Sequence, residues 1–209
     1  MKPRTTSTLA GLCALVLLAG CGGGSGGADA PAAAAPPPPA PSPPASPTAP
    51  TPPAPPPTVS GTRATCNLAN FASEAIRLVN QHRAAGASCG SRGSFPAAPA
   101  LAWNDALTQA SFVHSDDMMA NNFFSHTGSN GSSAGDRATA AGYVWRTWGE
   151  NIAAGQPSVA NVVQAWMASP GHCANVMNAS MRDIGLACVS GGAANTYRTY
   201  WTMTLGAAR

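Results

Sequence analysis

Cysteines are the residues of this 209-residue chain whose chemistry depends most on their spacing. Four of the six lie in the C-terminal part, as Cys66, Cys89, Cys173 and Cys188. Such a set forms disulfides in an oxidising compartment or binds zinc, but the Cys-x-x-Cys spacing of zinc sites is not present. Disulfides are therefore the prediction. Of the three possible pairings, the local one (Cys66 with Cys89, Cys173 with Cys188) is the most economical, at about 3 kcal/mol for each closed loop.

Serine and histidine neighbours are the second set of residues with possible chemistry. Ser125 precedes His126, and Ser115 follows His114. A nucleophilic serine needs a base within hydrogen-bond reach, and sequence neighbours on a helix or strand point in different directions. The sequence therefore singles out no nucleophile. His114 falls on the apolar face of an expected helix and is interpreted as a core histidine.

The N-terminus predicts export and lipidation. Lys2 and Arg4 precede an apolar run over 9–18 that is too short for a permanent membrane span, so residues 1–20 are interpreted as a signal peptide. The run ends in Leu-Ala-Gly-Cys, which resembles the bacterial lipobox and makes Cys21 the predicted lipidated residue. The two or three acyl chains of a lipoprotein cysteine give a stable membrane anchor. Gly22 favours the outer membrane over retention in the inner membrane.

Composition separates a tether from one domain. Residues 21–61 begin with Gly and Ser, and 31–58 hold fifteen of the twenty prolines, so this segment is predicted to be a disordered spacer. The remaining residues, 62–209, have the size of a single domain. They hold nine Arg, seven Asp plus Glu and no Lys, a net charge of about +2 without charge runs. Nucleic acid is therefore not an expected partner.

The hydrophobic periodicity predicts an α+β domain. Helices are expected over 70–86, 104–122, 136–141 and 158–168, with Asn70, Asn104 and Ser158 as N-caps and residues 169–171 as a stop. Strands are expected over 148–153, 184–189 and 197–205, the last two forming an antiparallel hairpin. The helices are expected to cover both faces of the sheet.

Six short segments occur in an order that resembles the bacterial branch of the CAP superfamily, over residues 70 to 206. This superfamily includes the cysteine-rich secretory proteins, antigen 5 and the plant pathogenesis-related proteins. The segments are Leu-Val-Asn-Gln-His-Arg (78–83), Phe-Ser-His-Thr (124–127), Gly-Glu-Asn-Ile (149–152), Ala-Trp-Met (165–167), Gly-His (171–172) and Tyr-Trp-Thr (200–202). The resemblance implies a three-layer α-β-α sandwich with an antiparallel central sheet.

The same resemblance implies a cleft of histidines and acids. His126 and Glu150 match the family's first histidine and the acid of its Gly-Glu-Asn motif, and His172 is the candidate second histidine. Ser169 stands where many members have a second acid, and Tyr200 stands near the second histidine of eukaryotic members.

His126, Glu150 and His172 are accordingly the candidate metal ligands and the candidate catalytic residues. Two imidazoles and a carboxylate are ligands that Zn²⁺ accepts, with water in a fourth position. A metal-dependent, peptidase-like hydrolase is therefore one alternative function, in which Glu150 serves as ligand or base. The other interpretation is that both histidines only hold loops in place. Arg83 is expected to pair with an acid such as Asp116 or Asp117.

The preferred prediction is an exported, lipid-anchored binding module of the bacterial envelope, with a non-catalytic role preferred over an enzymatic one. Family members have grooves for sterols, fatty acids or protein partners, so an apolar ligand or an envelope partner is expected. A structural protein that contacts peptidoglycan is a further alternative. Tryptophans are mostly core candidates, but Trp145 and Trp148 could line the cleft edge.

Overall fold

The computed structural model describes residues 62–209. The predictions for the signal peptide (1–20), the lipidated Cys21 and the tether (21–61) lie outside the described residues. Within the described part, no helix is long and apolar enough to cross a membrane.

A four-stranded sheet forms the centre of the domain. Its order is β3 (Ala102–Trp103), β5 (Asp183–Ser190), β6 (Thr199–Ala208) and β4 (Trp145–Ala154). β5, β6 and β4 pair antiparallel, and only the short β3 is parallel to its neighbour. The predicted antiparallel hairpin is therefore confirmed as β5–β6, and β4 is an edge strand.

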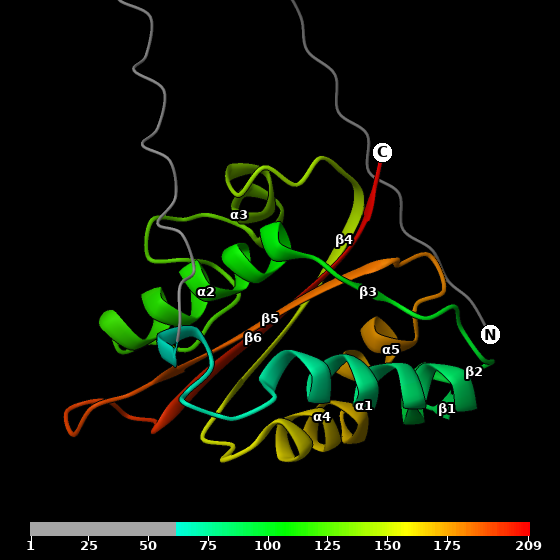
Figure 1. Ribbon diagram of the computed structural model, residues 1–209, viewed down its shortest axis with the longest axis horizontal. Helices are drawn as coiled ribbons and strands as arrows, with labels where there is room; N and C mark the ends of the chain where they lie inside the picture. The colour runs from blue at the N-terminus through cyan, green and yellow to red at the C-terminus, as the bar shows by residue number, and fades with distance from the viewer. Residues whose placement is uncertain (1–61) are drawn as a thin grey trace, which may run out of the picture. The chain divides into compact units, whose positions relative to one another are not determined.

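Helices cover both faces of this sheet (Figure 1). α2 (Asp105–Ala120) and α3 (Ala134–Ala140) lie on one face, and α1 (Phe71–Ala85), α4 (Val159–Ala168) and α5 (Pro170–Met177) lie on the other. Short elements complete the order: η1 (Thr62–Ala64), β1 (Ala87–Ser88), η2 (Gly90–Arg92) and β2 (Ser94–Phe95). The predicted α+β class and the α-β-α sandwich are confirmed.

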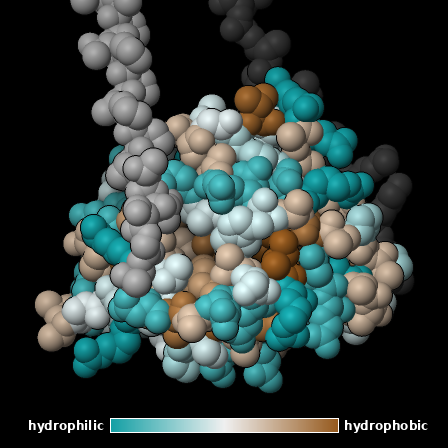
Figure 2. Space-filling view, viewed as in Figure 1, coloured by the Kyte–Doolittle hydropathy of each residue, from teal (hydrophilic) through white to brown (hydrophobic). Residues whose placement is uncertain are grey.

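The two faces of β6 have different chemistry. Trp201, Met203 and Leu205 are buried in the main apolar core, on the side of α1, α4 and α5. The alternate residues meet α2 through polar contacts, in which Thr202 bonds Ser115 and Thr204 bonds Ser111, both at 2.8 Å. On the face seen in Figure 2, hydrophilic residues predominate and hydrophobic ones form small separate patches. Apolar side chains are therefore mostly covered on this face.

The α2 helix approaches the sheet most closely at Gly185. A Cβ atom at this position would lie 2.1 Å from the carbonyl carbon of Leu107, which is in the helix backbone. The approach lets the Ser111 hydroxyl donate to the Gly185 carbonyl at 3.2 Å. Glycine is therefore required here by the packing of helix against strand.

Two of the three predicted N-caps are confirmed. Asn104 and Ser158 accept backbone N–H groups of the first turns of α2 and α4. Asn70 instead takes a left-handed conformation (φ 53°), and its side chain makes no capping hydrogen bond. That conformation is tolerated by asparagine, which explains why the residue suits a turn before the helix as well as a cap.

The stop predicted over 169–171 is only half correct. α4 ends at Ala168, but Pro170 is the first residue of a fifth helix, α5, that the sequence interpretation missed. Proline suits the first turn of a helix because its missing N–H has no partner there anyway. The observed β4 is also longer than the predicted strand, at Trp145–Ala154.

The cysteines form two disulfides, but the predicted local pairing is wrong. Cys66 pairs with Cys188 and Cys89 with Cys173, with Cα atoms 5.2 and 5.5 Å apart. The first bond follows from the segment before α1 lying along β5, where the Cys66 N–H donates to the Cys188 carbonyl at 3.0 Å. The second follows from the packing of the turn at η2 against α5.

The expected partner of Arg83 is also wrong. Its guanidinium is fully buried and donates to four backbone carbonyls, not to Asp116 or Asp117. The acceptors are the carbonyls of Pro99, Val176, Asn178 and Met181, at 2.7, 2.6, 3.0 and 3.3 Å. Asp116 pairs with Arg63 instead, and Asp117 bonds Ser129 and Asn121. Arg83 thus ties α1 to the end of α5.

Candidate functional site

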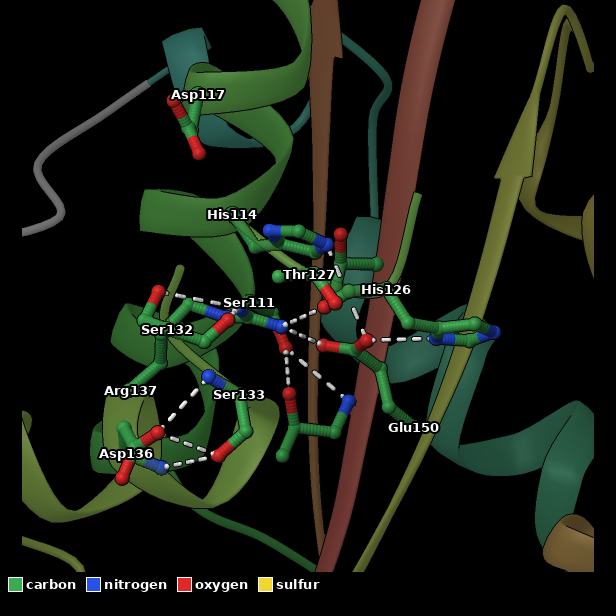
Figure 3. A network of polar contacts seen from close by, with 12 residues as sticks. Ser111, His114, Asp117, His126, Thr127, Ser132, Ser133, Asp136, Arg137 and Glu150 are labelled. Atoms are coloured by element: carbon green, nitrogen blue, oxygen red, sulfur yellow. Dashed lines mark hydrogen bonds and ion pairs between the residues drawn. The ribbon is translucent and has the colours of Figure 1, made fainter. Parts of the chain in front are cut away.

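Glu150 is the centre of the candidate site. It lies on β4 with 6% of its surface exposed, and both of its carboxylate oxygens have partners. Oε1 accepts from Nδ1 of His126 at 2.8 Å, and Oε2 accepts from a guanidinium nitrogen of Arg137 at 2.7 Å. In Figure 3 the Arg137 guanidinium and the His126 ring reach this carboxylate from opposite sides. The predicted pair His126 and Glu150 is therefore in direct contact.

Arg137 is a site residue that the sequence interpretation missed. It lies on α3, whose start is fixed by a capping box between Ser133 and Asp136. Besides Glu150, the guanidinium donates to the carbonyls of Ser132 at 2.7 Å and His126 at 3.1 Å. Arg137 therefore holds the loop that carries His126 as well as the carboxylate. The capping box was the local signal for this helix, but nothing in it indicates where the arginine points.

His114 forms the buried layer beneath this pair. Its ring is fully buried, and its Nε2 donates to the Ser125 carbonyl at 2.9 Å while lying 3.9 Å from Oε1 of Glu150. Burial lowers the pKa of His114. This effect of burial outweighs the nearby charge of Glu150, which by itself would raise the pKa. A neutral ring donating from Nε2 fixes the residue just before His126. The expectation of a core histidine is confirmed.

Electrostatics keep Glu150 ionised. Burial by itself would raise the pKa of this carboxyl, but the hydrogen bond from His126 and the charge of Arg137 outweigh it, so its pKa is below the ordinary value. An ionised carboxylate only accepts hydrogen bonds, so His126 must donate from Nδ1. The lone pair of neutral His126 is then on Nε2, which points away from Glu150 in Figure 3.

His172 lies on α5, and among the described residues no hydrogen bond joins its ring to the cluster around Glu150. Burial, and secondly the proximity of His126, lowers the pKa of its ring. The backbone of this segment is held by asparagines, because Asn151 donates to the His172 carbonyl and Asn175 donates to the Glu150 carbonyl, both at 3.1 Å. The structure thus places the two histidines near each other, while only His126 bonds Glu150.

The three candidate ligands do not form a metal centre as arranged. No group of three or more His, Cys, Asp and Glu side chains within residues 62–209 could hold a metal ion. Both oxygens of Glu150 already accept hydrogen bonds, one from His126 and one from Arg137. The zinc site at His126, Glu150 and His172 therefore stays a prediction from the sequence.

Two cavities lie one after the other along β4. The first, of about 340 Å³, is lined by Phe124, Ile152, Trp166, Ser169, His172 and Tyr197, among others. The second, of about 470 Å³, is lined by His126, Trp148, Gly149, Glu150 and Asn175, among others. Of the two tryptophans expected near the cleft, Trp148 lines the second cavity, and Trp145 packs against it edge to face with ring centroids 6.4 Å apart. Phe124, Trp148 and Tyr197 are each more than one third exposed.

The family follows from a comparison of the sequence with family models. A model described as the cysteine-rich secretory protein family, CAP, matches residues 76–205. The chain belongs to the CAP family. The matched segment runs from α1 to β6 and includes every residue of the site described above.

Relatives of this CAP domain occur in Bacillus subtilis (strain 168). The uncharacterized protein YkwD is 30% identical over 131 residues, which are 63% of this chain and 47% of YkwD. The uncharacterized membrane protein YlbC is 31% identical over 86 residues, 41% of this chain and 25% of YlbC. The chain therefore spans about half the length of the first relative and a quarter of the second.

Solved structures share the fold of this CAP domain. An extracellular protein with an SCP domain from Bacillus anthracis (strain Ames) has a TM-score of 0.51 and 24% identity, over 70% of this chain and 45% of that one. An outer surface protein from Borrelia burgdorferi has a TM-score of 0.51 and 18% identity, over 66% of this chain and 89% of that one. At these identities the likeness establishes the fold alone.

The Glu150→Gln substitution in this CAP domain tests its electrostatics. At pH 7 we expect it to lower the free energy of unfolding by about 1.5 to 3 kcal/mol, because Arg137 and His126 lose a charged acceptor. Since the folded pKa of Glu150 is depressed, its contribution is present above the ordinary value of about 4.5 and is lost as the pH falls through the folded value. Urea unfolding measures this effect. The difference in free energy of unfolding between wild type and variant should be smaller at pH 3 than at pH 7.

Glu74→Gln is the matched control for this experiment. Glu74 lies in the first turn of α1 and has no ion pair within the described residues. We expect it to change the free energy of unfolding by less than about 0.5 kcal/mol. Equal losses in the two variants at pH 7 would contradict the role given to Glu150.

Proposed function

We propose that this CAP domain is an extracytoplasmic binding module whose cleft takes up an apolar group of an envelope ligand, without turnover. The observation that carries the proposal is the buried carboxylate of Glu150, whose two oxygens are occupied by His126 and Arg137. A general base works best with a pKa near the working pH, and the pKa of Glu150 is shifted the other way. Glu150 therefore acts as an anchor for the cleft wall.

The apolar cavity beside this anchor supports a binding role. Phe124 and Tyr197 expose 45% and 37% of their surface at its rim, with ring centroids 5.9 Å apart. Trp166, which is 1% exposed, lines the same cavity. At about 340 Å³ the cavity is at the small end of ligand sites, which run from about 300 to 1,000 Å³. It suits one aromatic or aliphatic group.

The proposed location outside the cytoplasm rests on different support. The two disulfides join distant segments and are typical of an oxidising compartment. The structural neighbour from Bacillus anthracis is described as extracellular, and the one from Borrelia burgdorferi as an outer surface protein. The lipid anchor at Cys21, the outer-membrane location and a peptidoglycan contact stay predictions from the sequence.

Uptake of dodecanoate tests the apolar cavity. We expect dodecanoate to bind the full chain, to be unaffected by a chelator, and to bind Phe124→Ala about tenfold or more weakly, because a buried phenyl contact is worth about 1.5 to 3 kcal/mol. Displacement of a fluorescent fatty acid measures the affinity. Val144→Ala is the control, since Val144 is 67% exposed and does not line the cavity. Equal affinity in the two variants would overturn the proposal.

A hydrolase is the second candidate, and one observation favours it. Glu150 holds His126 with Nε2 directed away from the carboxylate, and the His126 side chain is 57% exposed. An imidazole oriented in this way can take a proton from water. Release of dye from labelled cell walls, lost in His126→Gln, would establish this function in place of simple binding.

A further inference from the structure

The cleft follows the free edge of β4. In the antiparallel ladder with β6, Gly149 pairs with Leu205 and Asn151 with Met203, and beyond the strand the Gly155 N–H donates to the Thr199 carbonyl. Backbone groups of successive residues alternate between the two sides of a strand. The odd-numbered residues from 147 to 155 thus face β6, and the even-numbered residues face away from the sheet.

Side-chain hydrogen bonds confirm this direction. The Glu150 carbonyl accepts from Asn175 at 3.1 Å, and the Ile152 carbonyl accepts from the Trp166 indole at 3.1 Å. Both donors come from the α4–α5 side of the cleft. Two outward carbonyls of β4 are therefore already satisfied by the protein.

The outward N–H groups of β4 differ from these carbonyls in their hydrogen bonding. By the register with β6, the N–H groups of Trp148, Glu150 and Ile152 face away from the sheet, and among the described residues no bond outside the sheet engages them. Consecutive outward groups of a strand are about 6.8 Å apart, twice the rise per residue. The edge therefore presents a row of three donors between carbonyls that are largely taken.

Residues of this stretch of β4 line both cavities. Trp148, Gly149 and Glu150 line the larger one, and Ile152 and Ala153 line the smaller one. Because Gly149 has no side chain, its contribution to the wall is its backbone. A ligand that fills the cleft must then supply acceptors at strand spacing, or leave buried N–H groups unpaired at about 1 to 3 kcal/mol each.

We propose that the ligand is an extended polypeptide segment that adds to the edge of β4. Its carbonyls accept from the N–H groups of Trp148, Glu150 and Ile152, and one apolar side chain enters the cavity beneath Phe124 and Tyr197. Alternate carbonyls of an extended chain have the spacing of these donors, and strand addition to an open edge is a common mode of peptide recognition. The inference rests on the proposed binding function and names its ligand class.

The alternative of a simple fatty acid satisfies only half of this surface. An acyl chain can fill the apolar cavity, but its single carboxylate cannot pair with three donors spread over about 14 Å of strand. The exposed ring of Trp148 stands at the other end of the row, beyond reach of that cavity's lining. A peptide uses both ends of the cleft at once.

The test is nuclear magnetic resonance on the oxidised, ¹⁵N-labelled full chain. The probes are a pool of acetylated, amidated heptapeptides of alternating valine and threonine with a varied central residue, and, separately, dodecanoate. We expect the peptide pool to shift the N–H resonances of Trp148, Glu150 and Ile152 and to slow their hydrogen exchange at least tenfold. The N–H groups of Gly149 and Asn151, already bonded to β6, should change little.

A matched pair of variants isolates one donor. Trp148→Ala removes the indole and keeps the N–H, whereas Trp148→Pro also removes the N–H, which an edge strand tolerates on its free side. We expect Trp148→Pro to bind the peptides about 3- to 10-fold more weakly than Trp148→Ala, the value of one hydrogen bond. Thermal unfolding of both variants verifies that they are folded.

The outcomes separate this inference from the proposed function. Peptide binding that leaves the three N–H groups unchanged, or equal affinity of the two Trp148 variants, would overturn strand addition and leave a binding cleft. Binding of dodecanoate alone would do the same. If neither probe binds, both proposals are wrong.

Discussion

Replacing Arg83 by methionine is expected to lower the free energy of unfolding by about 3 to 5 kcal/mol. The side chain is fully buried and donates to the carbonyls of Pro99, Val176, Asn178 and Met181. Methionine fills a similar volume but leaves these four acceptors without their donor. Two of them belong to the C-terminal end of α5, where a cation is also favoured by the helix dipole.

Urea unfolding of Arg83→Met and Arg77→Met measures this effect. Arg77 lies on the same helix, but it is exposed and, among the described residues, donates only to Gln81, at 3.4 Å. We expect Arg77→Met to change the free energy of unfolding by less than about 0.5 kcal/mol. The loss of unfolding free energy for Arg83→Lys should lie between those of the two methionine variants, because an ammonium keeps the charge but lacks the planar set of five donors. Similar losses for Arg83→Met and Arg77→Met would refute the role of Arg83.

The part of the fold that sequence predicts well is set by local signals. The apolar stripes of α1, α2 and α4 and the caps Asn104 and Ser158 each depend on residues within one or two turns. The β5–β6 hairpin likewise depends on alternation along two neighbouring strands. Where one residue type suits two structures, the prediction fails. Asn70 suited both a cap and a left-handed turn, and Pro170 suited both a helix stop and a helix start.

Contacts between distant segments were the main source of error. The two disulfides span 122 and 84 residues, and economy of loop length favoured the shorter pairings that the structure contradicts. The acceptors of Arg83 are backbone carbonyls, including one 93 residues away at Val176. A carbonyl is present at every position, so it leaves no mark in a sequence. An acidic partner was the only kind that the sequence could suggest.

In the candidate site, too, local motifs predict some residues, whereas contacts between distant segments determine others. His126 and Glu150 were found because short motifs carry them, and the structure joins them at 2.8 Å. Arg137 lies in none of those motifs, although it holds the second oxygen of Glu150. The free edge of β4 is a property of strand order, which places this strand outermost. Neither a buried arginine's direction nor a strand's position in a sheet is encoded by residue spacing.

Removing the Cys89–Cys173 disulfide is expected to lower the free energy of unfolding by about 4 to 5 kcal/mol. The loop it closes spans 84 residues, and the loss of chain entropy in the unfolded state grows with loop length. A local pairing would have contributed only about 3 kcal/mol on the same basis. Chemical unfolding of Cys89→Ala/Cys173→Ala under oxidising conditions measures the difference.

The second disulfide supplies the control, because it closes a loop of similar entropy and its cysteines do not line either cavity. Cys66–Cys188 spans 122 residues and ties the segment before α1 to β5, so its removal should cost about as much stability. Cys173, in contrast, follows His172 in the first turns of α5, beside the apolar cavity. We therefore expect dodecanoate affinity to fall in Cys89→Ala/Cys173→Ala and to persist in Cys66→Ala/Cys188→Ala while both are folded. Equal affinity in the two variants would mean that the wall of the cleft does not depend on the bond between α5 and the η2 turn.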